Sequence, residues 1–585
     1  MIIVISIFFS NNGILFAQPT LFDWAKQIGN GFACQVNYSK VSDVDSLGNI
    51  YCTGSYIYTT DFDPGSGVFN LTSTGFCDAF ILKLDNIGNF IWAKKIGGTG
   101  TAGASSSAIK LDSDGNIYSI GSFSETVDFD SGSGTYNLTS LGEDLYICKH
   151  DSMGNLIWAK GIGGLASSTV SGSSINVDKI GNLYITGKYN GTIDCDPNSG
   201  VYNLTPIISG SDNIFILKLN SSGNFVWAKS IEGTGSKEGK SIANDSAGNV
   251  YTTGFFEGNV DFDPNPGVYN LSSSVGSLDA FICKLDSSGN FVWAKNVGGS
   301  SSITTSNSLE LDMNSNVFIS GNFTGTSDFN PNSGVFNLTP LGYSDIYILK
   351  LDLNGNFIWV KSIQGAGLVS INDKGMSIAI DKMGNIYSTG YFQGSLDFDP
   401  GVGVYNLSTI LNSDNTFISK HDNSGNLIWA KKIDGSIGVR GLSISLDKTN
   451  NLYTIGMHRG TVDFNPDAAN FILTGMFDSV CGSYGDIFIH KMSQVEITTN
   501  FPTSITKNNF EFYPNPNTGI INVLMDESIH NTVIEIYNSI GIIVKKTEIK
   551  GKSLVINIEQ EPNGFYIIKA IRDKKVIAIE KIVKQ

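Results

Sequence analysis

The stretch Phe90–Gly98, FIWAKKIGG, decides the fold because variants of it recur along the chain. The other copies read FDWAKQIGN, LIWAKGIGG, FVWAKSIEG, FVWAKNVGG, FIWVKSIQG and LIWAKKIDG. All seven tryptophans of the 585-residue chain occupy its third position: Trp24, Trp92, Trp158, Trp227, Trp293, Trp359 and Trp429. Because a fixed period is the signature of a repeat architecture, these positions indicate a repeat of about 67 residues.

Each repeat contains four strand signals in a fixed order. Gly-Asn pairs mark the turn between the first and second strands and that between the third and fourth, as at Gly115-Asn116 and Gly154-Asn155. Glycine and asparagine tolerate the positive φ that tight hairpins require. Four antiparallel strands repeated seven times predict an all-β fold, a seven-bladed β-propeller.

The repeat resembles the bacterial β-propeller repeat family typified by D-I-F-x-x-K-L-D-x-x-G-N-x-x-W-A-K and G-N-x-Y-x-T-G. The resemblance covers residues 21–492 and implies a fold but hardly any activity. The last repeat lacks a fourth strand, whereas the copy at Trp24 has no repeat of its own. In known propellers such a mismatch closes the ring, so the resemblance implies that residues 21–28 pair with residues 486–492. We expect the propeller to span residues 18–492.

Both ends of the chain carry export signals. Residues 1–17 read MIIVISIFFSNNGILFA, which predicts a signal peptide cleaved after Ala17, with an ordinary buried strand as the alternative. No other segment offers the roughly 20 uninterrupted apolar residues of a transmembrane span. After a polar linker at residues 493–508, alternating apolar runs in residues 509–585 predict a small Ig-like β-sandwich.

The C-terminal segment resembles the type A C-terminal sorting domain of the type IX secretion system of Bacteroidetes. The residues that carry the resemblance are Tyr513, Pro514, Asn515, Pro516, Gly519, Gly564, Tyr566, Lys581 and Lys584. The family implies passage across the outer membrane, removal of the domain, and release or attachment at the cell surface. Its implied partner is the type IX secretion machinery, and an accessory binding sandwich is the alternative.

A short hairpin with an Asp-Phe-Asp-like start is inserted between the second and third strands of every repeat, as in DFDPGSGVFNLT at Asp61. In propellers these connections lie on the same face as the blade-to-blade loops, so seven such hairpins would form an acidic crown. Either the carboxylates cap their own turns, or they provide the oxygen ligands that Ca²⁺ prefers. The candidate calcium ligands are Asp61, Asp63, Asp128, Asp130, Asp194, Asp196, Asp261, Asp263, Asp397 and Asp399.

Two lysines recur in every repeat, one two residues after the Trp and one late in the third strand. We expect them to form a polar ladder across adjacent strands, with carboxylates such as Asp85 nearby.

Residues that depart from the repeat are the better candidates for a ligand site. Arg440 and Arg459 are two of only three arginines, and counting from the hairpin turn puts Arg440 opposite His458. This trio would bind an anionic ligand, unless it is an ordinary exposed cluster. A variable slot on the inner strand, which we expect to face the channel, holds Asp43, Lys110, Asn176 and Glu310.

Composition and motifs narrow the function. The chain has 54 acidic and 38 basic residues, a net charge of −16, which excludes nucleic acid as its main partner. No H-E-x-x-H, G-x-S-x-G, Walker or Rossmann motif is present. We therefore expect a secreted or cell-surface binding or adhesion module for glycan or protein, with calcium as the one candidate cofactor. The alternative is a carbohydrate-active lyase or hydrolase with its site at the channel mouth.

Overall fold

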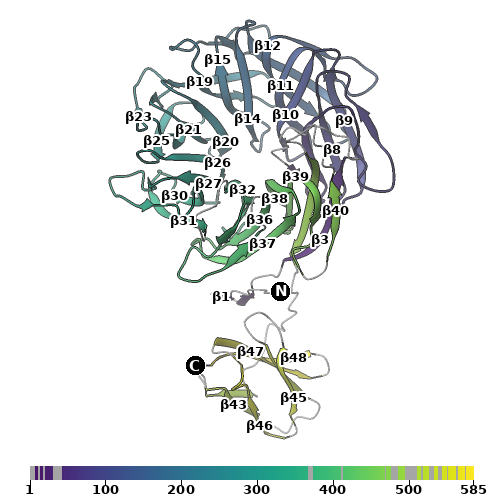
Figure 1. Ribbon diagram of the computed structural model, residues 1–585, viewed down its shortest axis with the longest axis vertical. Helices are drawn as coiled ribbons and strands as arrows, with labels where there is room; N and C mark the ends of the chain where they lie inside the picture. The colour runs from purple at the N-terminus through teal and green to yellow at the C-terminus, as the bar shows by residue number, and fades with distance from the viewer. Residues whose placement is uncertain are drawn as a thin grey trace. The chain divides into compact units, whose positions relative to one another are not determined.

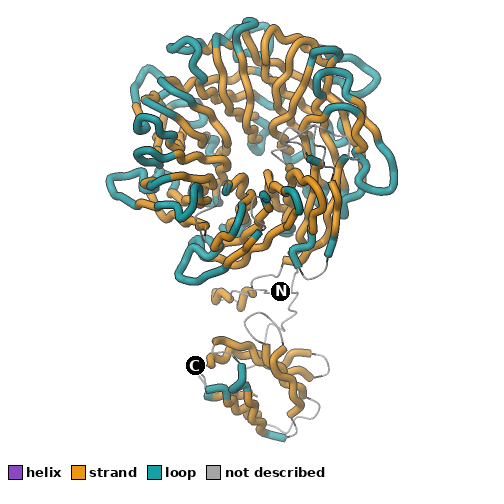
Figure 2. Tube along the Cα trace, viewed as in Figure 1, coloured by secondary structure: helices purple, strands orange, loops and turns teal. Residues whose placement is uncertain are grey.

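The computed structural model describes most of the propeller repeat and parts of the C-terminal segment (Figure 1). The described residues are 7–10, 13–16, 20–29, 42–365, 373–409, 413–467, 470–475, 485–494, 510–514, 518–525, 532–537, 543–549, 551–561, 564–572 and 575–584. They contain strands and loops without a helix (Figure 2). The chain divides into one compact unit over Phe22–Ser493 and a second made of Met1–Leu21 with Gln494–Gln585.

The larger unit is a β-propeller whose sheets surround a central axis (Figure 1). Its described strands form seven four-stranded antiparallel sheets, here blades 1 to 7, each starting from the strand nearest the axis. The strands are β4 (Ser42–Val44), β5 (Ile50–Tyr56), β8 (Asp78–Leu84), β9 (Phe90–Gly98); β10 (Gly103–Leu111), β11 (Ile117–Asp128), β12 (Asn137–His150), β13 (Leu156–Gly164); β14 (Thr169–Val177), β15 (Leu183–Asn190), β18 (Asn213–Leu219), β19 (Phe225–Gly233); β20 (Lys237–Asn244), β21 (Val250–Phe256), β24 (Asp279–Leu285), β25 (Phe291–Val297); β26 (Ile303–Leu311), β27 (Val317–Thr324), β30 (Asp345–Leu351), β31 (Phe357–Gly365); β32 (Lys374–Ile380), β33 (Ile386–Phe392), β36 (Asn415–His421), β37 (Leu427–Gly435); and β38 (Gly438–Leu446), β39 (Leu452–Asp463), β41 (Asp486–Gln494), β3 (Thr20–Ile28).

The inserted hairpins lie against the outer strands, not around the channel mouth. They comprise β6 (Thr59–Asp61), β7 (Asn70–Thr72), β16 (Ile193–Asp194), β17 (Asn203–Leu204), β22 (Asn259–Asp261), β23 (Asn270–Ser272), β28 (Ser327–Asp328), β29 (Asn337–Leu338), β34 (Ser395–Asp397), β35 (Asn406–Ser408), β40 (Ile472–Gly475) and the ends of β11, β12 and β39. Each pairs with the last residues of the preceding blade's outer strand, as β16 does with Gly163 and Gly164 of β13. These strand ends lead directly into the blade-to-blade connections, so the hairpins lie on the face expected for the acidic crown, beside the outer strands.

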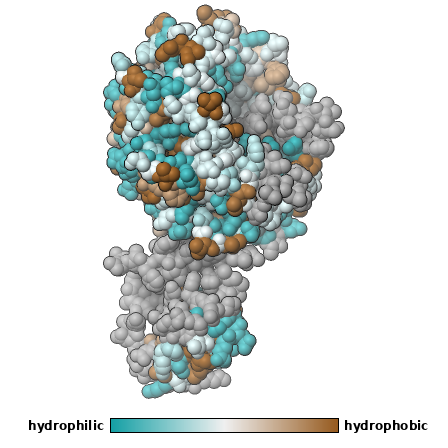
Figure 3. All heavy atoms as spheres, turned by 60° about the vertical axis from the view of Figure 1, so that its left-hand side comes forward, coloured by the Kyte–Doolittle hydropathy of each residue, from teal (hydrophilic) through white to brown (hydrophobic). Residues whose placement is uncertain are grey.

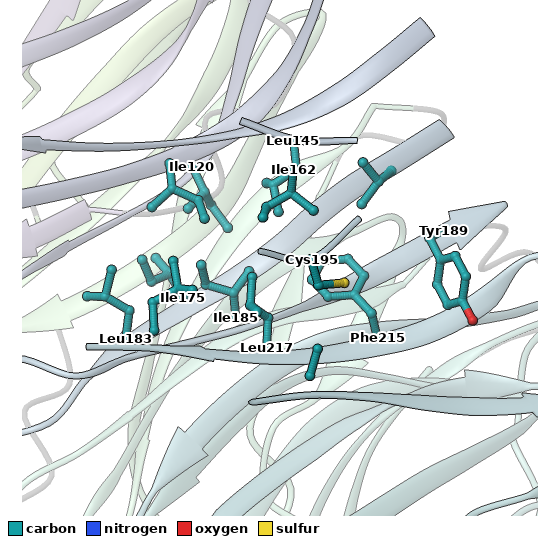
Figure 4. Packing of buried hydrophobic residues seen from close by; sticks show 14 of the residues in the cluster. Ile120, Leu145, Ile162, Ile175, Leu183, Ile185, Tyr189, Cys195, Phe215 and Leu217 are labelled. Carbon is teal, nitrogen blue, oxygen red and sulfur yellow. The ribbon is translucent and has the colours of Figure 1, made fainter. Parts of the chain in front are cut away.

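The hydrophobic core lies between adjacent blades. Ile120, Leu145 and Ile162 of blade 2 pack on Ile185 and Leu217 of blade 3, and all are at most 1% exposed (Figure 4). Each blade buries both faces of its sheet, so no blade has a core of its own. We therefore expect that a single repeat does not fold alone, and that closing the ring buries the faces that the first and last blades would otherwise expose.

The recurring lysines and tryptophans connect neighbouring blades. Lys284 Nζ lies 4.8 Å from the ring centroid of Tyr251 and donates a hydrogen bond to the carbonyl of Leu353 in the next blade. Trp293 Nε1 donates to the same carbonyl at 3.3 Å. The expected carboxylate partners are present at Lys149, Lys431 and Lys491, which form ion pairs with Asp112, Asp467 and Asp23. Asp85 instead accepts hydrogen bonds from its own turn. The lysine late in the third strand also makes a cation–π contact within its own blade and a hydrogen bond to the next blade.

The ring closes through β3, which lies beside β41 in the sheet order β3-β41-β39. Lys491 of β41 donates from Nζ to the carbonyl of Asn86 in blade 1 at 2.7 Å. Near the axis, the backbone N–H of Ser42 donates to Ser443 Oγ at 3.2 Å. The first and last repeats are therefore joined at the rim and at the axis by the contacts that join consecutive repeats.

The C-terminal unit contains two antiparallel sheets. Their strands are β42 (Phe510–Tyr513), β43 (Ile520–Met525) and β46 (Ser553–Asn557), and β45 (Ile543–Ile549), β44 (Thr532–Tyr537), β47 (Gly564–Arg572) and β48 (Lys575–Lys584). Ile521 and Val523 of one sheet and Ile534 and Ile568 of the other belong to one buried cluster, which makes the unit a β-sandwich. In residues 1–17 the structure describes two short paired strands, β1 (Ile7–Ser10) and β2 (Gly13–Phe16), and the signal peptide stays a prediction.

Candidate functional site

The innermost strands enclose a polar cavity of about 330 Å³ on the propeller axis. It is lined by β4, β10, β14, β20, β26, β32 and β38. Asp43, Lys110, Asn176 and Glu310, the variable slot found in the sequence, all line it. The cavity is thus the place where residues that differ between repeats come together.

Asp43, Lys110 and Glu310 bring opposite charges into this cavity. Lys110 Nζ lies 3.4 Å from Asp43 Oδ2, and the same oxygen accepts the backbone N–H of Leu111 at 2.9 Å. Asp43 raises the pKa of Lys110. Within the described part of the chain, the Glu310 carboxylate has no hydrogen bond or salt bridge, although its residue pairs with Phe318 through the strand backbone. Asp43 is committed to its neighbours, whereas the Glu310 carboxylate is open to a ligand.

Enclosure by protein shifts the acidity of Glu310. Desolvation within the ring raises its pKa to about 6, a rise that Lys110 opposes and Asp43 strengthens. The carboxylate nevertheless remains exposed to the water of the cavity. It therefore changes protonation near neutral pH while facing the solvent space.

A β-bulge in the inner strands adds residues to the lining that the sequence did not point to. The register of β14, β20, β26, β32 and β38 shifts by one residue, and the extra residue lines the cavity in each: Ser173, Lys240, Asn307, Met376 and Leu442. In the sequence, these residues differ from repeat to repeat, and each stands next to a small residue that recurs in the inner strand. A bulge cannot be seen in strand periodicity, so they were missed.

The structure does not bring Arg440 and His458 together, which corrects the expected trio. The bulge at Leu442 shifts the register, so Arg440 faces Met457, and Val439 faces His458. Arg440 instead forms an ion pair with Asp414 at 2.5 Å, with its guanidinium 4.9 Å from the Tyr391 ring.

His458 is buried at 1% exposure beside Phe464, and desolvation lowers its pKa to about 4. Arg459 lies opposite Gly438, next to the strand partner of His458. An imidazole that is buried and uncharged cannot attract an anion, so the geometry gives no support to a shared anion site of the three residues.

The hairpin carboxylates cap their own loops. Asp128 Oδ1 accepts the backbone N–H groups of Asp130 at 3.0 Å and Tyr136 at 2.8 Å, and Asp130 Oδ1 accepts that of Gly132 at 2.8 Å. The same bonds recur at Asp61, Asp63, Asp194, Asp196, Asp261, Asp263, Asp397 and Asp399.

Two observations bear on the calcium expectation. Where the second acidic residue is replaced by Asn330, its amide oxygen accepts the backbone N–H of Asn332 at 3.1 Å, so a neutral side chain performs the same task. Among the described residues, no group of three or more His, Cys, Asp or Glu is placed to hold a metal ion. The geometry therefore favours turn capping, and calcium binding stays an untested prediction.

The residues that resemble a sorting signal lie at the strand ends of the C-terminal unit. Tyr513 ends β42, Gly519 precedes β43, and Gly564 of β47 lies opposite Lys584 of β48. Tyr566 is buried at 3% exposure, Pro514 follows β42, and Lys581 lies opposite Ile567. Asn515 and Pro516 lie outside the described residues.

The family model of the secretion system C-terminal sorting domain matches residues 511–585. This segment is a secretion sorting domain. It makes the protein a secreted or cell-surface one that is handled by the type IX secretion machinery. The described part of the chain includes no helix with the length and apolarity of a membrane span.

Three known proteins are similar to the chain. An uncharacterized WD repeat-containing protein of Acanthamoeba polyphaga mimivirus is 24% identical over 552 residues, which is 79% of this chain and 38% of that protein. The chain thus spans well under half the length of this relative. A Bacteroides caccae protein of unknown function aligns at 11% identity and a TM-score of 0.30, covering 60% of this chain and 89% of its own. PorZ, a surface component of the type IX secretion system of Porphyromonas gingivalis, aligns at 12% identity and a TM-score of 0.18, and the alignment covers 96% of this chain and 100% of PorZ.

Proposed function

We propose that the propeller is a non-catalytic binding module, displayed outside the cell, that receives a polar group of a glycan or protein in its axial cavity. The observation that carries the proposal is the uncommitted carboxylate of Glu310 in a cavity of about 330 Å³. Concave sites with a few convergent polar groups are the usual form of a ligand pocket. The repeat does not explain Asp43, Lys110 and Glu310, which occupy the same strand position in different blades.

The test is binding of the full chain to arrays of glycans and of surface proteins, compared with Glu310→Gln and Lys110→Ala. Both side chains face solvent inside the cavity, so the variants should fold and melt like the wild type. We expect the array signal to fall at least tenfold in both variants. Binding that is unchanged by both substitutions would refute a site in the cavity.

A second candidate function is favoured by one observation. Two carboxylates, Asp43 and Glu310, line the same cavity, and the pKa of Glu310 is near 6, which suits a general acid. A carbohydrate-active enzyme with this pair would release reducing ends from a polysaccharide on long incubation, and Glu310→Gln would abolish the release. Bound ligand recovered intact would support the non-catalytic function.

A further inference from the structure

A second set of departures from the repeat gathers at the junction of blades 3 and 4. In four repeats the residue five positions after the Trp is a glycine. A Cβ added to this glycine would lie only 2.0 to 2.5 Å from a buried aspartate of the third strand, so a larger residue does not fit there. These pairs are Gly29 with Asp486, Gly97 with Asp78, Gly163 with Asp144, and Gly298 with Asp279. Blades 3 and 6 change both members, to Glu232 and Asn213 in blade 3 and to Asp434 and Asn415 in blade 6, and blade 3 alone has the longer glutamate. The carboxylate has moved from the third strand to the fourth.

Glu232 holds a loop that is longer than its counterparts in most other repeats, residues 205–212. Its Oε2 accepts the backbone N–H of Ile207 at 2.8 Å, and its Oε1 accepts the Tyr189 hydroxyl at 3.3 Å. Tyr189 belongs to the interblade core, where Figure 4 shows its hydroxyl at one end of the cluster. The loop is thus tied to a rigid part of the fold.

Lys237 fixes the other end of the same loop. It is fully buried, and its ammonium donates to the carbonyls of Asp212 at 2.7 Å, Gly233 at 2.9 Å and Gly235 at 3.1 Å. A buried ammonium is costly unless its donors are satisfied, so this arrangement holds the three backbone segments in one geometry.

These residues shape an outer groove of about 650 Å³ that crosses β19 between the inserted hairpins of blades 3 and 4. One wall carries Tyr202, at 40% exposure, with Ile207 at 85% and Ile208 at 42%. The ring of Tyr202 packs on Phe225 with centroids 4.7 Å apart. The groove therefore offers a supported aromatic ring beside aliphatic surface.

The charged groups of the groove already make hydrogen bonds within the protein. Lys229 donates to Asn265 Oδ1 at 2.9 Å, and Asp263 accepts the backbone N–H of Asn265 at 3.0 Å. The edge of β19 at Glu232 and Gly233 is hydrogen-bonded to β22, which removes backbone partners that an extended peptide would need. On the side to the left in Figure 1, exposed hydrophobic residues form small separate groups and not one broad apolar face (Figure 3).

We propose that this groove binds an uncharged oligosaccharide. An exposed aromatic ring packs against the C–H faces of a sugar, and the amides of Asn203, Asn259 and Asn270 along the groove provide donors and acceptors for its hydroxyls. The lining holds the carboxylates of Glu232, Asp261 and Asp263 against the one ammonium of Lys229, which disfavours an anionic ligand. Each of these groups already makes a hydrogen bond within the protein, which favours a neutral ligand. The site rests on the proposed binding function but is separate from the axial cavity, because the two share no lining residue.

The experiment uses the full chain and an array of neutral oligosaccharides, followed by calorimetric titration of each hit. Tyr202→Ala removes the platform, and Tyr269→Ala is its matched control, since Tyr269 packs on Phe291 at 4.9 Å in the next blade but does not line the groove. Ile207→Ser and Val275→Ser form a second pair on exposed loops of blades 3 and 4. We expect at least a tenfold loss of affinity in the groove variants and less than a twofold change in the controls.

The outcomes separate the groove from the cavity. Binding that is lost in Glu310→Gln but retained in Tyr202→Ala would support the axial site and overturn the groove. The groove proposal is also overturned if no neutral oligosaccharide binds, if charged glycans or peptides bind in their place, or if Tyr202→Ala and Tyr269→Ala weaken binding equally. The groove proposal is supported if Tyr202→Ala loses oligosaccharide binding, Tyr269→Ala keeps it, and the two variants have the same melting temperature.

Discussion

Glu232 accepts the backbone N–H of Ile207 at 2.8 Å, and by this contact it replaces an aspartate of the neighbouring strand. In blade 1 the same task falls to Asp78, which accepts the N–H of Thr74 at 3.1 Å, and in blade 5 to Asp345 with Leu341. In these three blades a carboxylate anchors the loop that leads into the third strand, and either of two adjacent strands can supply it.

The first prediction concerns this exchange in blade 3. Glu232→Gly leaves the loop without its anchor and should destabilise the propeller by about 1–3 kcal/mol. Asn213→Asp places a carboxylate beneath the Cβ of residue 232, but Lys237, which donates to Asn213 Oδ1 at 3.4 Å, attracts that carboxylate and reduces the loss of stability. The double variant recreates the pair found in blade 1, so its loss of stability should be clearly smaller than the sum of the losses of the two single variants. Chemical denaturation of the four proteins measures this coupling, and additive losses would contradict it.

The second prediction concerns closure of the ring. Lys491→Met removes the hydrogen bond to the Asn86 carbonyl and the ion pair with Asp23 at 3.2 Å, a loss of about 2 kcal/mol. Its matched control is Lys218→Met, which breaks the equivalent bond to Ser287 at 3.2 Å between blades that the chain already connects. We expect the melting temperature to fall further in Lys491→Met. Equal losses would mean that this contact is not special to the closing blade.

The third prediction separates turn capping from calcium binding. Asp128→Asn keeps an oxygen that accepts both backbone N–H groups, so it should be nearly neutral, whereas Asp128→Ala should cost about 1–2 kcal/mol. Chelator should leave the melting temperature of the wild type unchanged. A rise in melting temperature on adding Ca²⁺ that Asp128→Asn abolishes would instead establish the calcium site.

The fourth prediction is a pH dependence. His421 is 1% exposed, and desolvation lowers its pKa to about 4, below the value near 6.5 of an unfolded chain. The unfolded chain therefore takes up the proton first, and the stability present above pH 6.5 is lost as the pH falls toward 4. Four other blades have leucine at this position: Leu84, Leu219, Leu285 and Leu351.

His421→Leu should therefore lose less stability than the wild type between pH 7 and pH 4, by about 1–3 kcal/mol. Denaturant titrations at both pH values measure the difference. Parallel losses in the two proteins would show that another group controls the acid response.

The slot residues of the axial cavity could be found from the sequence, whereas its full lining could not. Asp43, Lys110, Asn176 and Glu310 stand out because they vary where the repeat is regular, and they do line the cavity. The bulge residues such as Lys240 and Asn307 were missed, because one extra residue leaves no trace in an alternating pattern. The same shift explains why Arg440 faces Met457 and not His458.

The sequence by itself determined the repeat, the four strands of each repeat, their turns and the sorting domain, because these depend on local periodicity and turn chemistry. Only the tertiary structure decided which side chains from different repeats meet. Glu232 and Ile207 are 25 residues apart, and Lys491 and Asn86 are 405 apart. Contacts of this kind follow from how the blades pack around the axis, and no local pattern encodes that geometry.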